Sequence, residues 1–179
     1  MRFSTWMRST VAAVGTLMIV ATGATPTMAA SAQQSIVPIG ALDGSWLALD
    51  GSKDSAQSLD NYSVTFGSGA DGTGGVIAIV GLIVLPSPDM AQSVVQSITD
   101  SSKAKNPGMS ILPSQTYGDA NGVEMAQADS GMVLQGRVFV DKGTVVYVIA
   151  VGPTAQADLI KTSADTLAYA QDNILPSNY

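Results

Sequence analysis

Histidine and cysteine are both absent from the 179 residues of this sequence. Without them the chain lacks the commonest general base, the thiol nucleophile and the soft metal ligands. A Ser-His-Asp triad is therefore excluded within one chain, and zinc and haem have no supporting ligand cluster. The missing cysteine also excludes disulfides and leads us to expect no lipid anchor on an N-terminal cysteine. We nominate no catalytic residue, no metal ligand and no cofactor.

Basic residues are scarce, with 8 Lys and Arg against 14 Asp and Glu, for a net charge of −6. If residues 1–32 are removed, Arg2 and Arg8 leave with them, and the net charge becomes 6 − 14 = −8. Such a chain repels phosphate backbones and anionic lipid headgroups, and no cluster of Lys and Arg offsets this. We therefore expect no nucleic-acid partner.

The N-terminal region has the three parts of a Sec-type signal peptide, which we assign to residues 1–32. Two arginines come first, an apolar run follows over residues 11–21, and small and polar residues follow over 22–32. Ala30-Ser31-Ala32 offers small side chains to a signal peptidase, so we expect cleavage before Gln33, with cuts after Ala29 or Ala30 as the alternatives.

The apolar run is shorter than the about 20 residues that a bilayer span requires. We therefore expect the leader to be removed, which leaves no membrane span. The predicted product is a secreted or periplasmic protein that is not a lipoprotein.

Residues 33–179 have the length of a single domain with its own core, 179 − 32 = 147 residues. Apolar and β-branched runs bounded by turn residues predict six to seven strands, and two amphipathic stretches predict helices. The fold class that we expect is α+β, an antiparallel sheet with helices packed on its faces. The main predicted segments are strands over 45–49, 61–66 and 76–85, a helix over 88–104, a three-stranded meander over 122–151 and a helix over 154–172.

The centre of the predicted sheet is the hairpin over 132–151. We interpret Asp141-Lys142-Gly143 as a three-residue connection, which sets Val140 opposite Thr144 and Arg137 opposite Tyr147. Both faces of this hairpin are mostly apolar, as is the run over 76–85. We therefore expect other elements to cover both faces of the sheet.

Two glycine motifs are interpreted as turns. Gly67, Gly69 and Gly72 satisfy G-x-G-x-x-G, but a β-branched run follows where a dinucleotide fingerprint needs a helix, so we predict a hairpin loop. Asn121-Gly122 is a strong hairpin dipeptide, and we place it in a turn over 118–122.

Three acids recur every seven residues on the last predicted helix, Asp158, Asp165 and Asp172. A metal or acid–base role is one interpretation. Because Lys161 lies three residues after Asp158 and four before Asp165, we favour a solvated stripe with salt bridges.

Three residues are candidates for binding: Arg137, Tyr147 and Trp46. Arg137 is the only arginine left after removal of the leader, and the proposed register places it beside Tyr147. We favour a structural cation–π pair over anion recognition. A slip of one residue in the neighbouring hairpin would instead place Glu124 on the Arg137 face as an ion-pair partner. For Trp46 we favour an anchor in the core or at its rim over a ligand platform.

The order of elements over about 75–175 resembles the PsbP-like α/β/α sandwich superfamily. The motifs that carry the resemblance are a Ser-Pro-initiated helix, Gly122-Val123 opening a strand, GRVFV, and VVYVIAVG before a closing helix. The chain is similar to the exported bacterial branch related to mycobacterial LpqN lipoproteins, although it lacks their lipid-bearing cysteine. The resemblance implies an antiparallel sheet between helices and an accessory or protein-binding role.

The function that we expect is an exported, non-catalytic module that binds a protein or a small ligand. The alternative is a hydrolase using Asp and Ser side chains, or a calcium-dependent factor, built from the 67–75 and 114–122 loops. The partner and the oligomeric state are left open.

Overall fold

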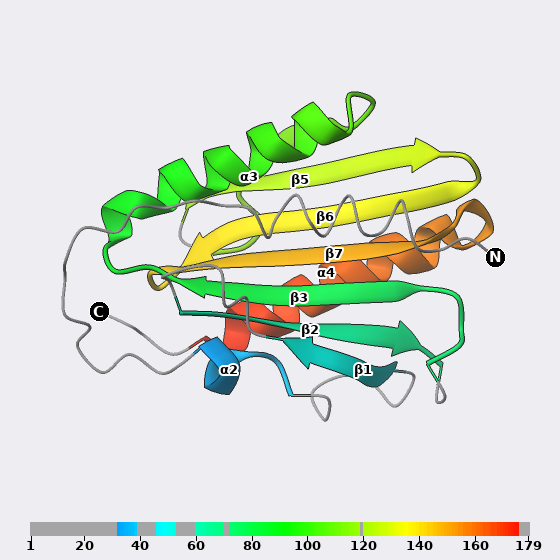
Figure 1. Ribbon diagram of the computed structural model, residues 1–179, viewed down its shortest axis with the longest axis horizontal. Coiled ribbons are helices and arrows are strands. Elements are labelled where there is room, and N and C mark those ends of the chain that lie inside the picture. Colours follow the sequence, from blue (N-terminus) through cyan, green and yellow to red (C-terminus); the bar gives the residue numbers. More distant parts are fainter. Residues whose placement is uncertain (1–31, 39–45, 53–59, 70–71, 119, 176–179) are drawn as a thin grey trace.

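The computed structural model describes residues 32–38, 46–52, 60–69, 72–118 and 120–175. They form one antiparallel sheet of seven strands in the order β1-β2-β3-β7-β6-β5-β4 (Figure 1). The strands are β1 (Trp46–Ser52), β2 (Asp60–Ser68), β3 (Ile77–Val84), β4 (Ser110–Ser114), β5 (Ala120–Asp129), β6 (Met132–Asp141) and β7 (Thr144–Pro153).

The helices are the short α2 (Ala32–Ser35), α3 (Ala91–Lys105) and α4 (Ala157–Ile174). Single 3-10 turns, η2 (Pro88–Met90) and η3 (Thr154–Gln156), lead into α3 and α4. The predicted α+β class, an antiparallel sheet with packed helices, is confirmed. The predicted leader, apart from Ala32, lies outside the described residues.

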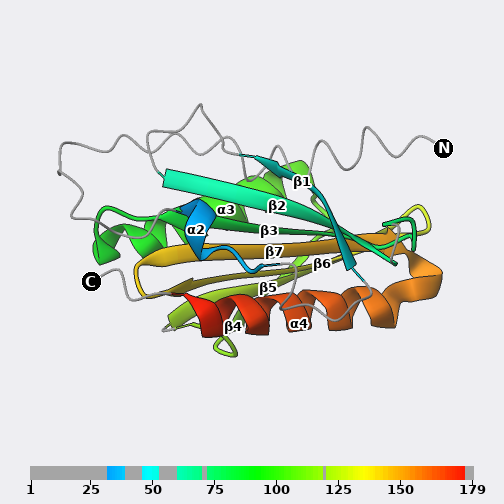
Figure 2. The same cartoon turned by 90° about the horizontal axis from the view of Figure 1, so that it is seen from below.

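The two long helices pack on opposite faces of the sheet, and Figure 2 shows α4 running beneath it. Since strand side chains alternate between faces, each central strand feeds both cores. The α4-side core joins Ile160, Ala164, Leu167 and Ala168 of α4 to Val80, Val146 and Val148. The α3-side core joins Val94, Val95 and Ile98 of α3 to Met125, Leu134 and Val145.

The register predicted for the central hairpin is wrong by one residue. Asp141 pairs with Thr144, so the connection is the two-residue turn Lys142-Gly143, with φ of 48° and 77°. Positive φ at both positions is typical of a type I′ turn, whose twist matches that of the strands. Arg137 therefore pairs with Val148, and Val138 pairs with Tyr147, which puts Arg137 and Tyr147 on opposite faces of the sheet.

The placement of Asn121-Gly122 in a turn is also wrong. Both residues lie in β5, where Gly122 pairs with Ser114 and the β5–β6 register shifts between Ala120 and Val123. A Cβ at Gly122 would lie 3.0 Å from the Ser114 carbonyl oxygen and 3.2 Å from that of Val138. Glycine is required here by close backbone approach beside an irregularity in the strand.

The glycine-rich segment after β2 is a hairpin connection, as predicted. The Ser68 amide donates to the Val76 carbonyl oxygen at 2.9 Å, and the Val76 amide donates to Ser68 Oγ at 3.1 Å. The strand β3 follows, so no helix N-terminus stands where a dinucleotide phosphate would need one.

Candidate functional site

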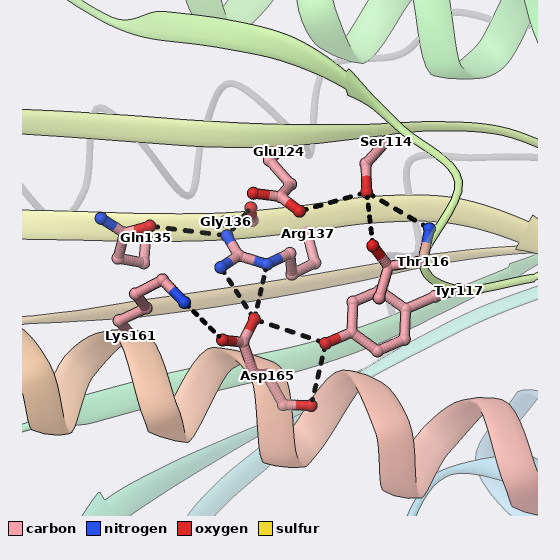
Figure 3. Close-up of polar contacts among 9 residues, drawn as sticks. All are labelled: Ser114, Thr116, Tyr117, Glu124, Gln135, Gly136, Arg137, Lys161 and Asp165. Carbon is pink, nitrogen blue, oxygen red and sulfur yellow. Dashed lines mark hydrogen bonds and ion pairs between the residues drawn. The ribbon is translucent and has the colours of Figure 1, made fainter.

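Arg137 lies in the middle of β6 with its side chain only 2% exposed, on the face that α4 covers (Figure 3). Its Nε and Nη2 groups donate to Asp165 Oδ1 at 2.9 and 2.8 Å. Nη1 donates to the Gly136 carbonyl oxygen at 2.7 Å and to Gln135 Oε1 at 3.5 Å. The guanidinium is thus held by one helix carboxylate and by its own strand.

Asp165 is the centre of this site, since three side chains converge on its carboxylate. Besides Arg137, Lys161 Nζ lies 3.1 Å from Oδ2, and the Tyr117 hydroxyl donates to Oδ1 at 3.3 Å. Figure 3 shows the three approaching from the sheet, the helix and the β4–β5 connection. We call these four residues, Arg137, Asp165, Lys161 and Tyr117, the Arg137–Asp165 cluster.

The electrostatics of the cluster favour an ionised Asp165. Partial burial acts to raise the pKa of its carboxyl group, but the hydrogen bond from Lys161 and the charge of Arg137 act in the other direction. Together the two cations outweigh burial, and the pKa of Asp165 lies below its ordinary value. Burial, followed by the negative charge of Asp165, raises the pKa of the Tyr117 hydroxyl, which stays a neutral donor.

The solvated stripe predicted on the last helix is only partly correct. Lys161 does pair with Asp165, four residues on, and Asp158 is exposed. Asp165 instead points at the sheet, and Asp172 Oδ1 accepts the Gly118 amide at 3.0 Å. Two of the three acids therefore fasten α4 to β6 and to the β4–β5 connection.

Tyr117 is the second link between that connection and the body of the fold. Its ring lies 5.5 Å from the Phe139 ring, centroid to centroid, with an interplanar angle of 34°. Beside it, the Ser114 hydroxyl donates to Glu124 Oε1 at 3.1 Å, and Glu124 pairs with Arg137 in the sheet. No pattern in the sequence links Tyr117 to Asp165, since 48 residues separate them.

The three predicted binding residues lie apart. Tyr147 is on the α3 side and packs over Gly81, so the predicted cation–π pair with Arg137 is wrong. Trp46 is in the edge strand β1, half-buried against the α4-side core. Arg137 is in β6, and three strands, β2, β3 and β7, separate it from β1.

The loops proposed for an alternative Asp/Ser or calcium site lie at opposite ends of the sheet. A Cβ at Gly118 would touch the Val140 carbonyl oxygen, and one at Gly152 would lie 3.0 Å from the Gly75 carbonyl oxygen. Val140 pairs with Val145, and the stretch of β7 from there to Gly152 covers about 23 Å. The two loops therefore cannot converge on one substrate. Asp71 and Asp119 lie outside the described residues.

The contacts of the Arg137–Asp165 cluster give it a structural role, that of holding α4 against the sheet. Its guanidinium is buried and its carboxylate already has two cations and a hydroxyl as partners. The described residues contain no group of three or more acidic side chains that could hold a metal ion. The part of the chain that the structure describes also has no helix fit to cross a bilayer.

No protein-family model matches the chain, and no curated relative matches it. Solved structures with a similar fold include the extracellular domain of PknH from Mycobacterium tuberculosis, at 15% identity and a TM-score of 0.52, over 84% of this chain and 100% of that one. LpqN, involved in cell envelope biogenesis of the same organism, has 16% identity and a TM-score of 0.42, over 74% of this chain and 79% of that one.

Cyanobacterial PsbP from Synechocystis sp. PCC 6803 has 13% identity and a TM-score of 0.41, over 87% of this chain and 96% of that one. At these identities the likeness concerns the fold alone. At that level the predicted resemblance to PsbP and LpqN is confirmed.

Proposed function

We propose that this chain is an exported, non-catalytic module that binds another protein in the cell envelope or outside the cell. The observation that carries the proposal is the outer face of α4, which is exposed and carries no charge. Leu159 is 45% and Tyr169 65% exposed on this face. The face comprises Leu159, Thr162, Thr166, Tyr169 and Asn173, all of them exposed.

A helix on the surface of a globular protein usually presents charged and polar residues opposite its buried stripe. The charges of α4 are instead gathered on one flank, where Asp165 and Asp172 bond to the sheet side. Exposed tyrosine and leucine are typical of protein contacts, in which aromatic residues contribute much of the binding energy.

The geometry favours a protein over a small ligand. The outer face of a helix is convex, whereas small-molecule sites are concave and bury most of the ligand. A second copy of this chain is disfavoured, because an antiparallel α4 pair centred between Thr162 and Thr166 would bring Asp158 close to Asp172 of the other copy. We infer a partner with an apolar contact bordered by cations.

Export is supported by the three-part pattern of a leader that the sequence predicts at the N-terminus. The PknH domain with this fold is extracellular, which supports the same side of the membrane for this chain. The scarcity of reactive groups supports a binding role, since the sequence has neither histidine nor cysteine and the Arg137–Asp165 cluster is closed on itself.

Photo-crosslinking in intact cells tests the proposal. The full chain, with its own leader, carries a photoreactive residue at Tyr169, or at Leu112 as a matched control. Leu112 is 61% exposed on the edge strand β4. We expect one protein to be cross-linked from position 169, with the yield reduced by Leu159→Ser, and none from position 112. Equal yields at both positions, or none at 169, would contradict the proposed surface.

A further inference from the structure

The first described residues of the chain form part of the fold. Ala32 is fully buried, and its methyl group belongs to the α4-side core. Its backbone amide donates to Asp60 Oδ2 at 2.7 Å, which ties the start of α2 to the first residue of β2. A hydrogen bond to a carboxylate is stronger than one between neutral groups, so this is a firm attachment point.

A second attachment follows within five residues. Gln171 of α4 is fully buried, and its amide group bonds the passing backbone on both sides. Nε2 donates to the Ser35 carbonyl oxygen at 2.8 Å, and Oε1 accepts the Val37 amide at 2.8 Å. Gln171 thus holds the segment as a neighbouring strand would, with one donor and one acceptor.

We propose that the leader is cut upstream of Ala32, after Ala29 or Ala30, so that Ala32 stays in the exported protein. This inference rests on the proposed export and goes beyond it by choosing the bond. The small residues alone favour cleavage before Gln33. That cut would remove Ala32, and with it both the buried methyl group in the core and the amide that donates to Asp60. It also puts the new terminal charge inside the short helix α2, between the two attachments.

The sequence upstream offers the chemistry that this choice needs. For a cut after Ala29, small residues stand three and one positions before the bond, namely Thr27 and Ala29. A cut after Ala30 has Met28 and Ala30 at these positions, so the bond after Ala29 fits the peptidase better. A cut after Ala29 leaves two residues before Ala32, and a cut after Ala30 leaves one. Either product keeps the peptide amide of Ala32, which is the donor to Asp60.

The test is N-terminal sequencing and intact mass of the exported protein, made as the full precursor in a secreting bacterial host. We expect the first residue to be Ala30 or Ser31. A first residue of Gln33 would overturn the inference while leaving the proposed export intact. An uncleaved chain beginning at Met1 and retained in the cell would overturn both.

A pair of variants separates the candidate bonds without depending on folding. Ala32→Leu removes the small residue that a cut before Gln33 requires but leaves the upstream bonds unchanged. We expect Ala32→Leu to be processed at the same bond and to the same extent as the wild type. Gln34→Leu, which adds the same side chain at an exposed position two residues on, controls for effects on translocation. Loss or displacement of cleavage in Ala32→Leu alone would refute the upstream cut.

Discussion

Removal of the Asp165 carboxylate should destabilise the protein more than removal of its buried partner Arg137. In Asp165→Ala the guanidinium of Arg137, only 2% exposed, loses its one carboxylate partner in the cluster. In Arg137→Leu the buried charge itself disappears and an apolar side chain replaces part of its stem. Asp165 then keeps Lys161 and Tyr117 as partners and is 33% exposed to water.

The magnitudes follow from the burial of each partner. Breaking a buried ion pair by removing one member costs about 3–5 kcal/mol, while replacing buried charge with apolar groups is often much cheaper. Because the Asp165 side chain is 33% exposed, water screens part of the interaction. We therefore expect Asp165→Ala to cost about 2–3 kcal/mol and Arg137→Leu about 1 kcal/mol.

Urea unfolding of the processed protein, followed by far-UV circular dichroism, measures both values from the midpoint and slope. Lys161→Ala is the matched control, because Lys161 binds the same carboxylate from a side chain that is 62% exposed. It should cost no more than about 0.5 kcal/mol. The double variant Asp165→Ala/Arg137→Leu should be more stable than the sum of the single changes predicts. An Arg137→Leu cost equal to or above that of Asp165→Ala would refute the reasoning.

Two further predictions concern the pH dependence of stability and the packing of Gly81 on the α3 side of the sheet. The pKa of Asp165 is lowered on folding, so its contribution is complete above the ordinary value of 3.8 and is lost as the pH falls through the lower folded value. Asp165→Asn should therefore flatten the fall in unfolding free energy below about pH 4, and an unchanged slope would contradict this assignment. Gly81→Ala should cost about 2–3 kcal/mol, because the added methyl would overlap the ring of Tyr147. Tyr147→Ala should recover part of that loss in the double variant, and a thermal melt of the three proteins checks it.

The sheet and its two covering helices could be predicted because apolar periodicity reports burial directly. The run over 76–85 lacks polar alternation, and β3 is indeed buried on both faces. The exact pairing could not be predicted, because Asp-Lys-Gly fits a two-residue or a three-residue turn equally well. Lysine at φ of 48° is uncommon for a residue with a side chain, so composition argued against the turn that forms.

The Arg137–Asp165 cluster escaped prediction for two physical reasons. The one-residue error in register moved Arg137 to the wrong face and away from α4. In addition, Asp165 has Lys161 at helical spacing, which accounts for its charge without any contact to the sheet. The contact between Asp165 and Arg137 leaves no pattern in a single sequence, because the two residues lie far apart along the chain. Only the presence of one arginine amid an apolar strand indicated that a counter-charge must lie nearby.

The closed cluster and the uncharged outer face of α4 have a common consequence for binding. Asp165 and Asp172 fix the helix against the sheet, so the exposed stripe of α4 is held in place from its flank. A rigid contact surface loses less conformational entropy on association. Substitutions in the cluster should therefore weaken partner binding only to the extent that they unfold or loosen α4, whereas Tyr169→Ser and Leu159→Ser should weaken it with no change in the melting temperature. A variant of the outer face that lowered stability as much as Asp165→Ala would show that the face is structural instead.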